Sequence, residues 1–462
     1  MGFSAQNTGL WNPIIQFGIL AAILVVSNML QRRVPFVRKL LMPTAVLGGL
    51  LALALRGMGI ITIDTAFMEN VTYHTIALGF IALGLRMPKA SERAEHKKDG
   101  LKSGLLIVGT YLLQAVVGLA ITGVLAYTVS PGLFKAAGIL LPMAYGQGPG
   151  QANNIGTTYE TAYGFAGGST FGLSLATMGF LWACIGGVIY MNYLIRKGKL
   201  TLSAGNEKKT DITVGHFQDE GEIPMSESVD RLTMQLAMVL LVYLATYLVS
   251  WAITSGLAAV PAFAGVASTL GSLIWGFNFI IGSLFALLLR NLLVSLKKRS
   301  IIKRQYPNNY LLNRISGMIF DMMIIASISA INIEDLAGMW VPFILLSTVG
   351  GIVTLIYLKW ICKRLYPAYY HEGFFAMYGM MTGTVSTGIL LLREVDPHYT
   401  TPATTNLITG TSFAILFGVP LLVFVGLAPQ SDTLFFVTMA SCLLYGIGIH
   451  FLLLRGTKKA TK

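Results

Sequence analysis

Long apolar runs, separated by short basic or glycine-rich stretches, dominate the pattern of this chain. A run of about twenty apolar residues is long enough for a helix to cross a hydrocarbon core of about 30 Å, and these runs lack the alternation of lipid-facing strands. The pattern therefore predicts an all-α integral membrane protein. Spanning helices are expected at eleven places: 12–30, 40–56, 70–87, 104–127, 169–193, 232–253, 268–293, 312–331, 337–360, 404–427 and 432–454.

Two further segments, 132–160 and 369–394, contain too many Gly, Pro and polar residues to span lipid as regular helices. We predict that both are re-entrant hairpins, the first entering from the outside and the second from the cytoplasm. If both crossed the membrane instead, the basic cluster at 297–304 and the Lys and Arg residues of 196–209 would lie outside. That arrangement would violate the excess of positive charge on the cytoplasmic side.

The two hairpins carry related motifs, YGQGPG at 145–150 and YGMMTG at 378–383, and polar residues follow each motif. Ordinary GxxxG helix packing is the alternative interpretation. The motifs occupy equivalent places in two halves of opposite orientation, which favours an inverted repeat. The predicted organisation is a first repeat at 12–193, a cytoplasmic linker at 194–231, a second repeat at 232–427 and an extra C-terminal helix at 432–454.

Composition and charge narrow the class of protein. Of 462 residues, 54% are hydrophobic and only 11% are charged, which excludes a soluble protein of this size. The net charge of +13 comes from short clusters between apolar runs, so it indicates topology rather than nucleic-acid binding. The clusters place the N-terminus outside and the C-terminus in the cytoplasm, and the first apolar run is expected to be a retained helix rather than a signal peptide.

Hairpins from opposite faces can bring their tips together near the middle of the membrane, where helix N-termini bind carboxylates and backbone or side-chain oxygens bind a hard cation. The alternative for single residues is helix packing. The candidate substrate-binding residues are Gln147, Gly148, Gly150, Gln151, Asn153, Asn154, Thr382, Gly383, Thr384, Ser386, Thr387 and Arg393.

Asp321 lies within an apolar run, where a carboxylate is costly unless it faces protein or water. We predict that Asp321, with Asn406 and Thr409, couples a cation to transport. Pairing of Asp321 with Arg314 or Arg290 is an equally weighted alternative. Arg393 could clamp a substrate carboxylate or lie at the membrane interface.

Motifs of catalysis are absent from the sequence, which has no HExxH, no GxSxG and no P-loop lysine. We therefore expect a transporter rather than an enzyme, with no cofactor and no structural metal. The three cysteines lack metal-ligand spacing. A channel is a further alternative, although selectivity filters usually come from several subunits around one pore axis.

Three stretches resemble the glutamate/sodium symporter family: YGQGPGQANN at 145–154, TFGLSLATMGF at 170–180 with Gly186-Gly187, and YGMMTGTVSTG at 378–388. The resemblance implies sodium-driven glutamate uptake by alternating access, Na⁺ as the coupling ion, and a homodimer in a bacterial inner membrane. Gln147 stands where that family commonly has His, and Asp321 stands where a small hydroxyl residue is expected. A sodium- or proton-coupled carrier of another small carboxylate or amino acid therefore stays open as the alternative.

Overall fold

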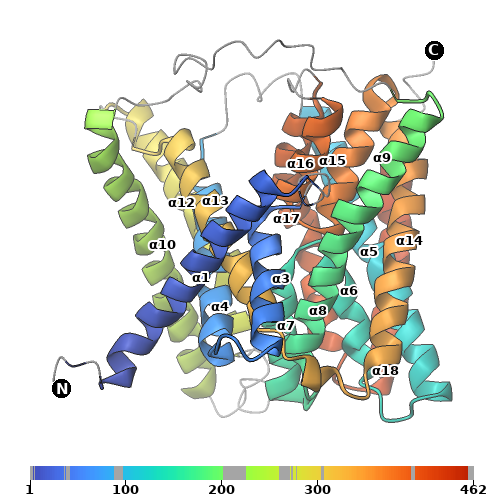
Figure 1. Cartoon of the computed structure of the whole chain (residues 1–462). Coiled ribbons are helices and arrows are strands. Elements are labelled where there is room, and N and C mark those ends of the chain that lie inside the picture. Colours follow the sequence, from blue (N-terminus) through green and yellow to red (C-terminus); the bar gives the residue numbers. More distant parts are fainter. Residues whose placement is uncertain are drawn as a thin grey trace. The chain divides into compact units, whose positions relative to one another are not determined.

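Helices make up the computed structural model, and no strand occurs among the residues it describes (Figure 1). The described residues are 4, 6–35, 37, 42–87, 97–200, 225–259, 271, 274–276, 278–302, 306–396 and 401–455. Three predictions fall partly outside these ranges: the linker at 194–231 over 201–224, the helix at 40–56 over its first two residues, and much of the first half of the helix at 268–293.

The helices occur where the apolar runs predict them. In the first half of the chain they are α1 (Thr8–Arg33), α3 (Thr44–Gly57), α4 (Thr65–Gly84), α5 (Lys97–Thr128), η2 (Lys135–Ile139), α6 (Leu140–Tyr145), α7 (Pro149–Tyr163), α8 (Gly168–Leu181), η3 (Trp182–Gly186) and α9 (Gly187–Arg196). In the second half they are α10 (Met225–Ala259), α12 (Asn278–Lys298), α13 (Asn309–Ser329), η6 (Ile333–Leu336), α14 (Trp340–Leu365), η7 (Pro367–Tyr369), α15 (Tyr370–Thr382), α16 (Val385–Val395), α17 (Ala403–Leu427) and α18 (Asp432–Arg455).

The prediction of an all-α, multi-pass membrane protein is confirmed. Among the described residues, seven helices are long and apolar enough to cross a membrane, and α17, which bends by 43° near its middle, would be an eighth. The apolar helix α3 has only 14 residues, which at 1.5 Å per residue is shorter than a typical crossing. The count of eleven crossings therefore stays a prediction.

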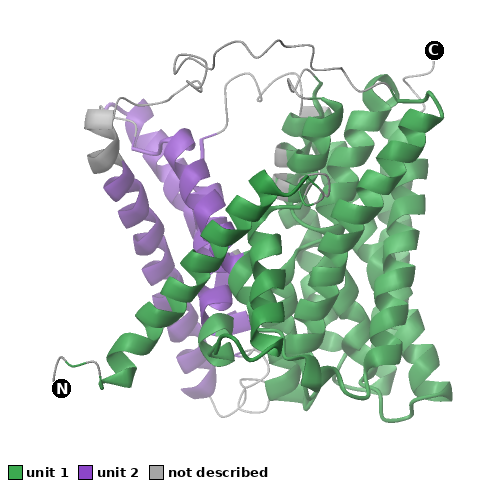
Figure 2. Cartoon of the chain, viewed as in Figure 1, with its two compact units in different colours: residues 1–69, 90–203, 324–462 green, residues 70–89, 204–323 purple. Residues whose placement is uncertain are grey.

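Two compact units divide the chain (Figure 2). Unit 1 comprises residues 1–69, 90–203 and 324–462, and unit 2 comprises residues 70–89 and 204–323. Each unit contains segments of both predicted repeats. The two compact units therefore do not coincide with the two repeats that the sequence motifs predict. The boundaries of the inverted repeats stay a prediction.

Unit 2 is held together by an aliphatic core contributed by α4, α10, α12 and α13. Ile81, Val239, Ala286 and Leu312 are among its fully buried members. Gly84 lets α4 approach α12 closely, because a Cβ atom at Gly84 would lie 2.8 Å from the Cβ of Ala286. Burial of each Ile, Val or Leu side chain of this core contributes about 1.5–3 kcal/mol.

Unit 1 is organised around α5, which packs against α14, α17 and α18 (Figure 1). Small residues on α5 permit backbone-to-backbone approach. Gly104 lies against Phe413 of α17, and Gly118 lies against the backbone of Gly138 in η2, so any side chain at either glycine would collide with its neighbour. Both predicted hairpin segments belong to this unit.

Candidate functional site

The first hairpin breaks at Gly146–Gly148, between α6 and α7. Gly148 has φ +89° and ψ −178°, a backbone conformation that is essentially restricted to glycine, and Pro149 follows as the first residue of α7, where its fixed φ suits a helix start. At the other end of the hairpin, the rings of Phe134 and Phe165 stack with centroids 4.6 Å apart. The chain therefore enters and leaves this segment at the same end.

The second hairpin breaks at Gly383 and Thr384, between α15 and α16. The two arms lie side by side, because a Cβ atom at Gly388 would be 2.5 Å from the carbonyl oxygen of Ala376. The hydroxyl groups of Thr384 and Thr387 lie 3.3 Å apart in the first turn of α16. The depth of either hairpin in a membrane stays a prediction.

The tips of the two hairpins are in contact. A Cβ atom placed on Gly148 would lie 3.2 Å from Cγ2 of Thr384 and 3.7 Å from the carbonyl oxygen of Gly383. Helices α7 and α16 both begin at this contact, with 15 and 11 residues respectively. Because the first backbone N–H groups of a helix have no partner within it, two helix N-termini meeting in this way form a region of positive potential without a charged side chain.

Three polar side chains of α7 predicted from the sequence are buried close to this tip. Gln151, in the first turn of α7, is 1% exposed, and neither atom of its amide has a hydrogen-bond partner in the part of the chain that the structure describes. Asn153 accepts a hydrogen bond of 2.8 Å from the hydroxyl of Ser169 on α8. Asn154 is buried beside it. A buried polar group that lacks a partner requires an explanation, and a ligand is one.

Glycines of α8 hold both tips in place. A Cβ atom at Gly172 would lie 2.5 Å from the carbonyl oxygen of Ala152 on α7. One at Gly179 would collide with the carbonyl oxygen of Thr382 at the end of α15 and would lie 3.0 Å from the ring of Tyr145 on α6. Helix α8 thus contacts arms of both hairpins through small residues, as helices in membranes commonly do.

The two related motifs differ in their position relative to the breaks. In the first hairpin the Tyr145-Gly146 pair lies at the break itself, whereas in the second the Tyr378-Gly379 pair lies within α15, about one turn before the break. Both tyrosines are fully buried and donate to backbone carbonyls, Tyr145 to Ser347 at 2.6 Å and Tyr378 to Trp182 at 3.0 Å. The shared motif therefore anchors each hairpin, while Gly148 and Gly383 shape the tips.

The structure gathers most of the candidate substrate-binding residues near the tips. Gln147 and Gly148 lie in the first break, and Gly150, Gln151, Asn153 and Asn154 follow on α7. Thr382, Gly383, Thr384 and Thr387 surround the second break, and Ser386 lies in the first turn of α16, with its side chain outside the described residues. Their roles in binding stay predictions.

Arg393 lies elsewhere. It is exposed near the C-terminal end of α16, eight residues beyond Val385 and hence about 12 Å along the helix from the tip. The structure thus separates Arg393 from the other candidates. Its role as a carboxylate clamp stays a prediction.

The candidate cation-coupling residues lie in three different environments. Asn406 is 1% exposed and donates to the hydroxyl of Tyr369 at 2.7 Å. Thr409 donates back to the carbonyl of Thr405 in its own helix. Asp321 belongs to unit 2 and is exposed, and no ion pair between Asp321 and Arg314 occurs within the described ranges. Coupling through Asp321 stays a prediction.

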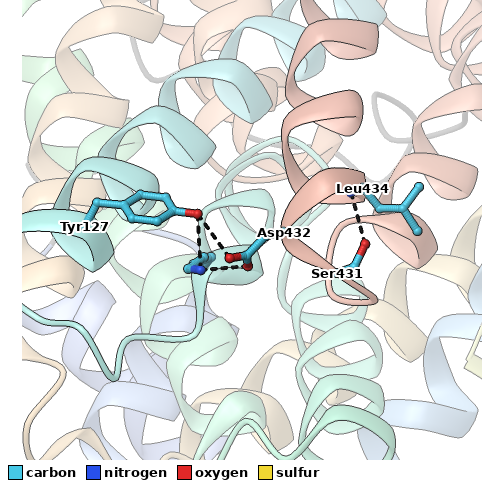
Figure 3. Close-up of polar contacts among 5 residues, drawn as sticks. Tyr127, Ser431, Asp432 and Leu434 are labelled. Carbon is cyan, nitrogen blue, oxygen red and sulfur yellow. Dashed lines mark hydrogen bonds and ion pairs between the residues drawn. The ribbon is translucent and has the colours of Figure 1, made fainter.

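A pocket of about 680 Å³ lies at the opposite end of the first hairpin from its tip. It is lined by Phe134, Phe165 and the ion pair of Lys135 with Asp432, whose charged atoms are 2.7 Å apart. Figure 3 shows the hydroxyl of Tyr127 pointing toward this pair. Since α7 is about 22 Å long, this pocket is separate from the hairpin contact.

Carboxylates gather at the N-terminus of α8. The hydroxyl of Ser169 lies 3.0 Å from Glu69, its backbone N–H donates to Glu160 at 3.3 Å, and Thr170 donates to Asp335 at 3.3 Å. Acidic groups are favourable at a helix N-terminus. No group of three or more His, Cys, Asp or Glu side chains with metal-binding geometry is present among the described residues.

Two residues of α5 that the sequence reasoning missed, Tyr111 and Gln114, donate to backbone carbonyls beside the two breaks. The available signal was an isolated Gln in the apolar run 104–127. A polar side chain at membrane depth is costly without a partner.

Long apolar helices establish a polytopic membrane protein, and a pair of glycine-broken hairpins with touching tips is typical of secondary transporters. The sequence profile of the sodium/glutamate symporter family matches residues 13–400. The chain belongs to this family, which confirms the resemblance drawn from its motifs and indicates a transport function rather than an enzymatic one. The match ends before α17 and α18 begin. A comparison with curated proteins found no match.

Proposed function

We propose that this protein carries out sodium-coupled symport of glutamate by alternating access. The observation that carries the proposal is the contact of Gly148 with Gly383 and Thr384, at which α7 and α16 both begin. Two helix N-termini supply partial positive charge and N–H donors for a carboxylate. Family membership supports glutamate and Na⁺ as the transported species.

Neutral oxygen atoms near the tips suit the coupling ion. The hydroxyls of Thr384 and Thr387 and the backbone carbonyls of the two breaks are hard ligands of the type that Na⁺ prefers. Binding of both ligands where the hairpins touch would favour one conformation over the other, and this difference in affinity is what couples the sodium gradient to uptake. We further propose, from the family resemblance, a homodimer in a bacterial inner membrane, and, from the distribution of Lys and Arg, an N-terminus outside and a C-terminus in the cytoplasm.

The first test is uptake of labelled glutamate into proteoliposomes that contain the purified protein. An inward Na⁺ gradient is compared with an equal K⁺ gradient at the same membrane potential. We expect accumulation with Na⁺ alone. Equal uptake under both gradients would contradict sodium coupling, and uptake of another carboxylate but not glutamate would contradict the substrate.

The second test separates binding from stability at Gln151. The buried amide of Gln151 has no hydrogen-bond partner among the described residues, so Gln151→Leu removes no hydrogen bond. The variant should therefore be more stable by about 1–3 kcal/mol or unchanged in stability. Glutamate uptake should nevertheless fall sharply. A more stable and less active variant is the expected result for a residue whose partner is the ligand.

Gln235 provides the matched control. It is 2% exposed, but its amide is satisfied, donating to the carbonyl of Tyr306 at 2.8 Å and accepting from the N–H of Asn308 at 3.0 Å. Gln235→Leu should therefore lower the melting temperature while leaving the half-saturating glutamate concentration unchanged. If Gln151→Leu behaved like Gln235→Leu, Gln151 would be a structural residue and no ligand contact.

A further inference from the structure

Helix α5 carries two buried polar side chains one turn apart, Tyr111 and Gln114, which are 7% and 1% exposed. Residues three apart on a helix face the same side. Each side chain donates a hydrogen bond to a backbone carbonyl beside one of the two hairpin breaks. One face of α5 thus makes the same kind of hydrogen bond to each of the two hairpins.

Tyr111 holds the first hairpin. Its hydroxyl donates to the carbonyl oxygen of Gly146 at 3.1 Å, immediately after the end of α6. Its ring lies against the Cα of Gly146 so closely that a Cβ atom there would collide with it. The carbonyls at the end of a helix lack a partner within the helix, and Tyr111 supplies one.

Gln114 holds the second hairpin. Its amide nitrogen donates to the carbonyl oxygen of Met381 at 3.0 Å, in the last turn of α15, and to the hydroxyl of Thr354 on α14 at 2.9 Å. Thr354 in turn donates to Gly350 in its own helix at 2.7 Å. Gln114 therefore ties the end of α15 to both α5 and α14.

We infer that Tyr111 and Gln114 are positioning residues that set the two hairpin tips against each other, an inference that rests on the proposed function of those tips. Gly148 and Thr384 lie just beyond the two carbonyls that these side chains hold. Both tips are thereby hydrogen-bonded to the same stretch of α5. Loss of one hydrogen bond should loosen one tip and leave the other in place.

The experiment measures the two tips separately and without substrate. Single-cysteine reporters are introduced at the half-buried positions Gln147 and Thr384, and the rate of labelling by a small maleimide is measured on the purified protein. Each reporter is combined with Tyr111→Phe or Gln114→Met. The protein without a reporter gives the background from its native cysteines, which are all buried.

Tyr111→Phe should label about fivefold faster at the Gln147 reporter with no change at the Thr384 reporter, and Gln114→Met should show the reverse. A fivefold change corresponds to about 1 kcal/mol, the usual net contribution of one hydrogen bond, because each side chain makes one hydrogen bond to a hairpin carbonyl. Tyr159→Phe is the matched control, because Tyr159 is fully buried and its hydroxyl donates to Val425 at 2.6 Å, away from the tips. It should change neither rate.

Equal acceleration at both reporters, or in all three variants, would show general loosening and overturn the positioning role, as would no change at either reporter. If Gln114→Met does not fold, Gln114→Asn draws the amide back by roughly one bond length, about 1.5 Å, and should give the same selective effect.

Transport provides a second readout. Each positioning variant should raise the half-saturating glutamate concentration about fivefold, and Tyr159→Phe should not. Failure of the parent protein to take up glutamate would count against the proposed function alone, because the labelling pattern requires no substrate.

Discussion

The contact between the hairpin tips can be tested by a double-mutant cycle on Gly148 and Thr384. Gly148→Ala places a Cβ atom in a backbone conformation that costs about 1–3 kcal/mol for a residue other than glycine. The same Cβ atom would lie 3.2 Å from Cγ2 of Thr384, closer than the 3.5–4.0 Å that is optimal between carbon atoms. The first penalty is local to the backbone, whereas the second depends on the other hairpin.

Thr384→Ser distinguishes the two penalties. It removes Cγ2 and keeps the hydroxyl that faces Thr387. We expect Thr384→Ser to recover part of the stability lost in Gly148→Ala, with a coupling free energy of about 0.5–3 kcal/mol, as is usual for residues in contact. Thermal denaturation of the four purified proteins in detergent measures the free energies of unfolding. The half-saturating glutamate concentration should rise about 5- to 30-fold in Gly148→Ala and fall back in the double variant.

Gly164 is the control for backbone strain. It has φ +70°, yet a Cβ atom there would meet nothing within 4 Å. Gly164→Ala should therefore lower stability without any coupling to Thr384→Ser. If the effects of Gly148→Ala and Thr384→Ser are also additive within about 0.5 kcal/mol, the tips do not touch and the proposed anion site loses its basis.

Three further predictions follow from the packing and charges of unit 1. Gly179→Ala should lower the free energy of unfolding by about 1–3 kcal/mol, because its Cβ atom would collide with the carbonyl of Thr382. Gly418 has open space around it, so Gly418→Ala should leave stability unchanged or increase it. Thermal denaturation checks both variants. Replacing Lys135 and Asp432 together by Met and Asn should leave the melting temperature unchanged in high salt, because their ion pair is exposed. Burial raises the pKa of Glu69, just outside the predicted crossing at 70–87, so its folded form holds a proton more tightly than its unfolded form and stability decreases as pH rises through that pKa. Glu69→Gln should therefore melt at a higher temperature than the parent near pH 8 and at the same temperature near pH 4; a constant difference would contradict the assignment.

The second hairpin shows which features of a helix break the sequence motifs predict and which they do not. Gly and Thr in an otherwise apolar segment are sufficient to predict a break, because they weaken the helix and leave polar groups that lipid cannot satisfy. The repeated YGxxxG spacing suggests equivalent tips, yet Tyr378 lies a turn before its break while Tyr145 lies at its own. The position of each break depends on what packs against it, and a motif does not contain that information.

The amino-acid pattern is sufficient to establish the class of this protein. Its long apolar runs and its polar, glycine-rich interruptions are local properties that hydropathy reports directly, and its family motifs are local as well. Which of these interruptions meet is visible only in the folded protein. The contact of Gly148 with Thr384, the hydrogen bonds from Tyr111 and Gln114, and the separation of Arg393 from the tips all join or divide residues far apart in the chain. Such relations follow from how helices pack, and packing is set by small differences in side-chain volume that hydrophobic patterning does not resolve.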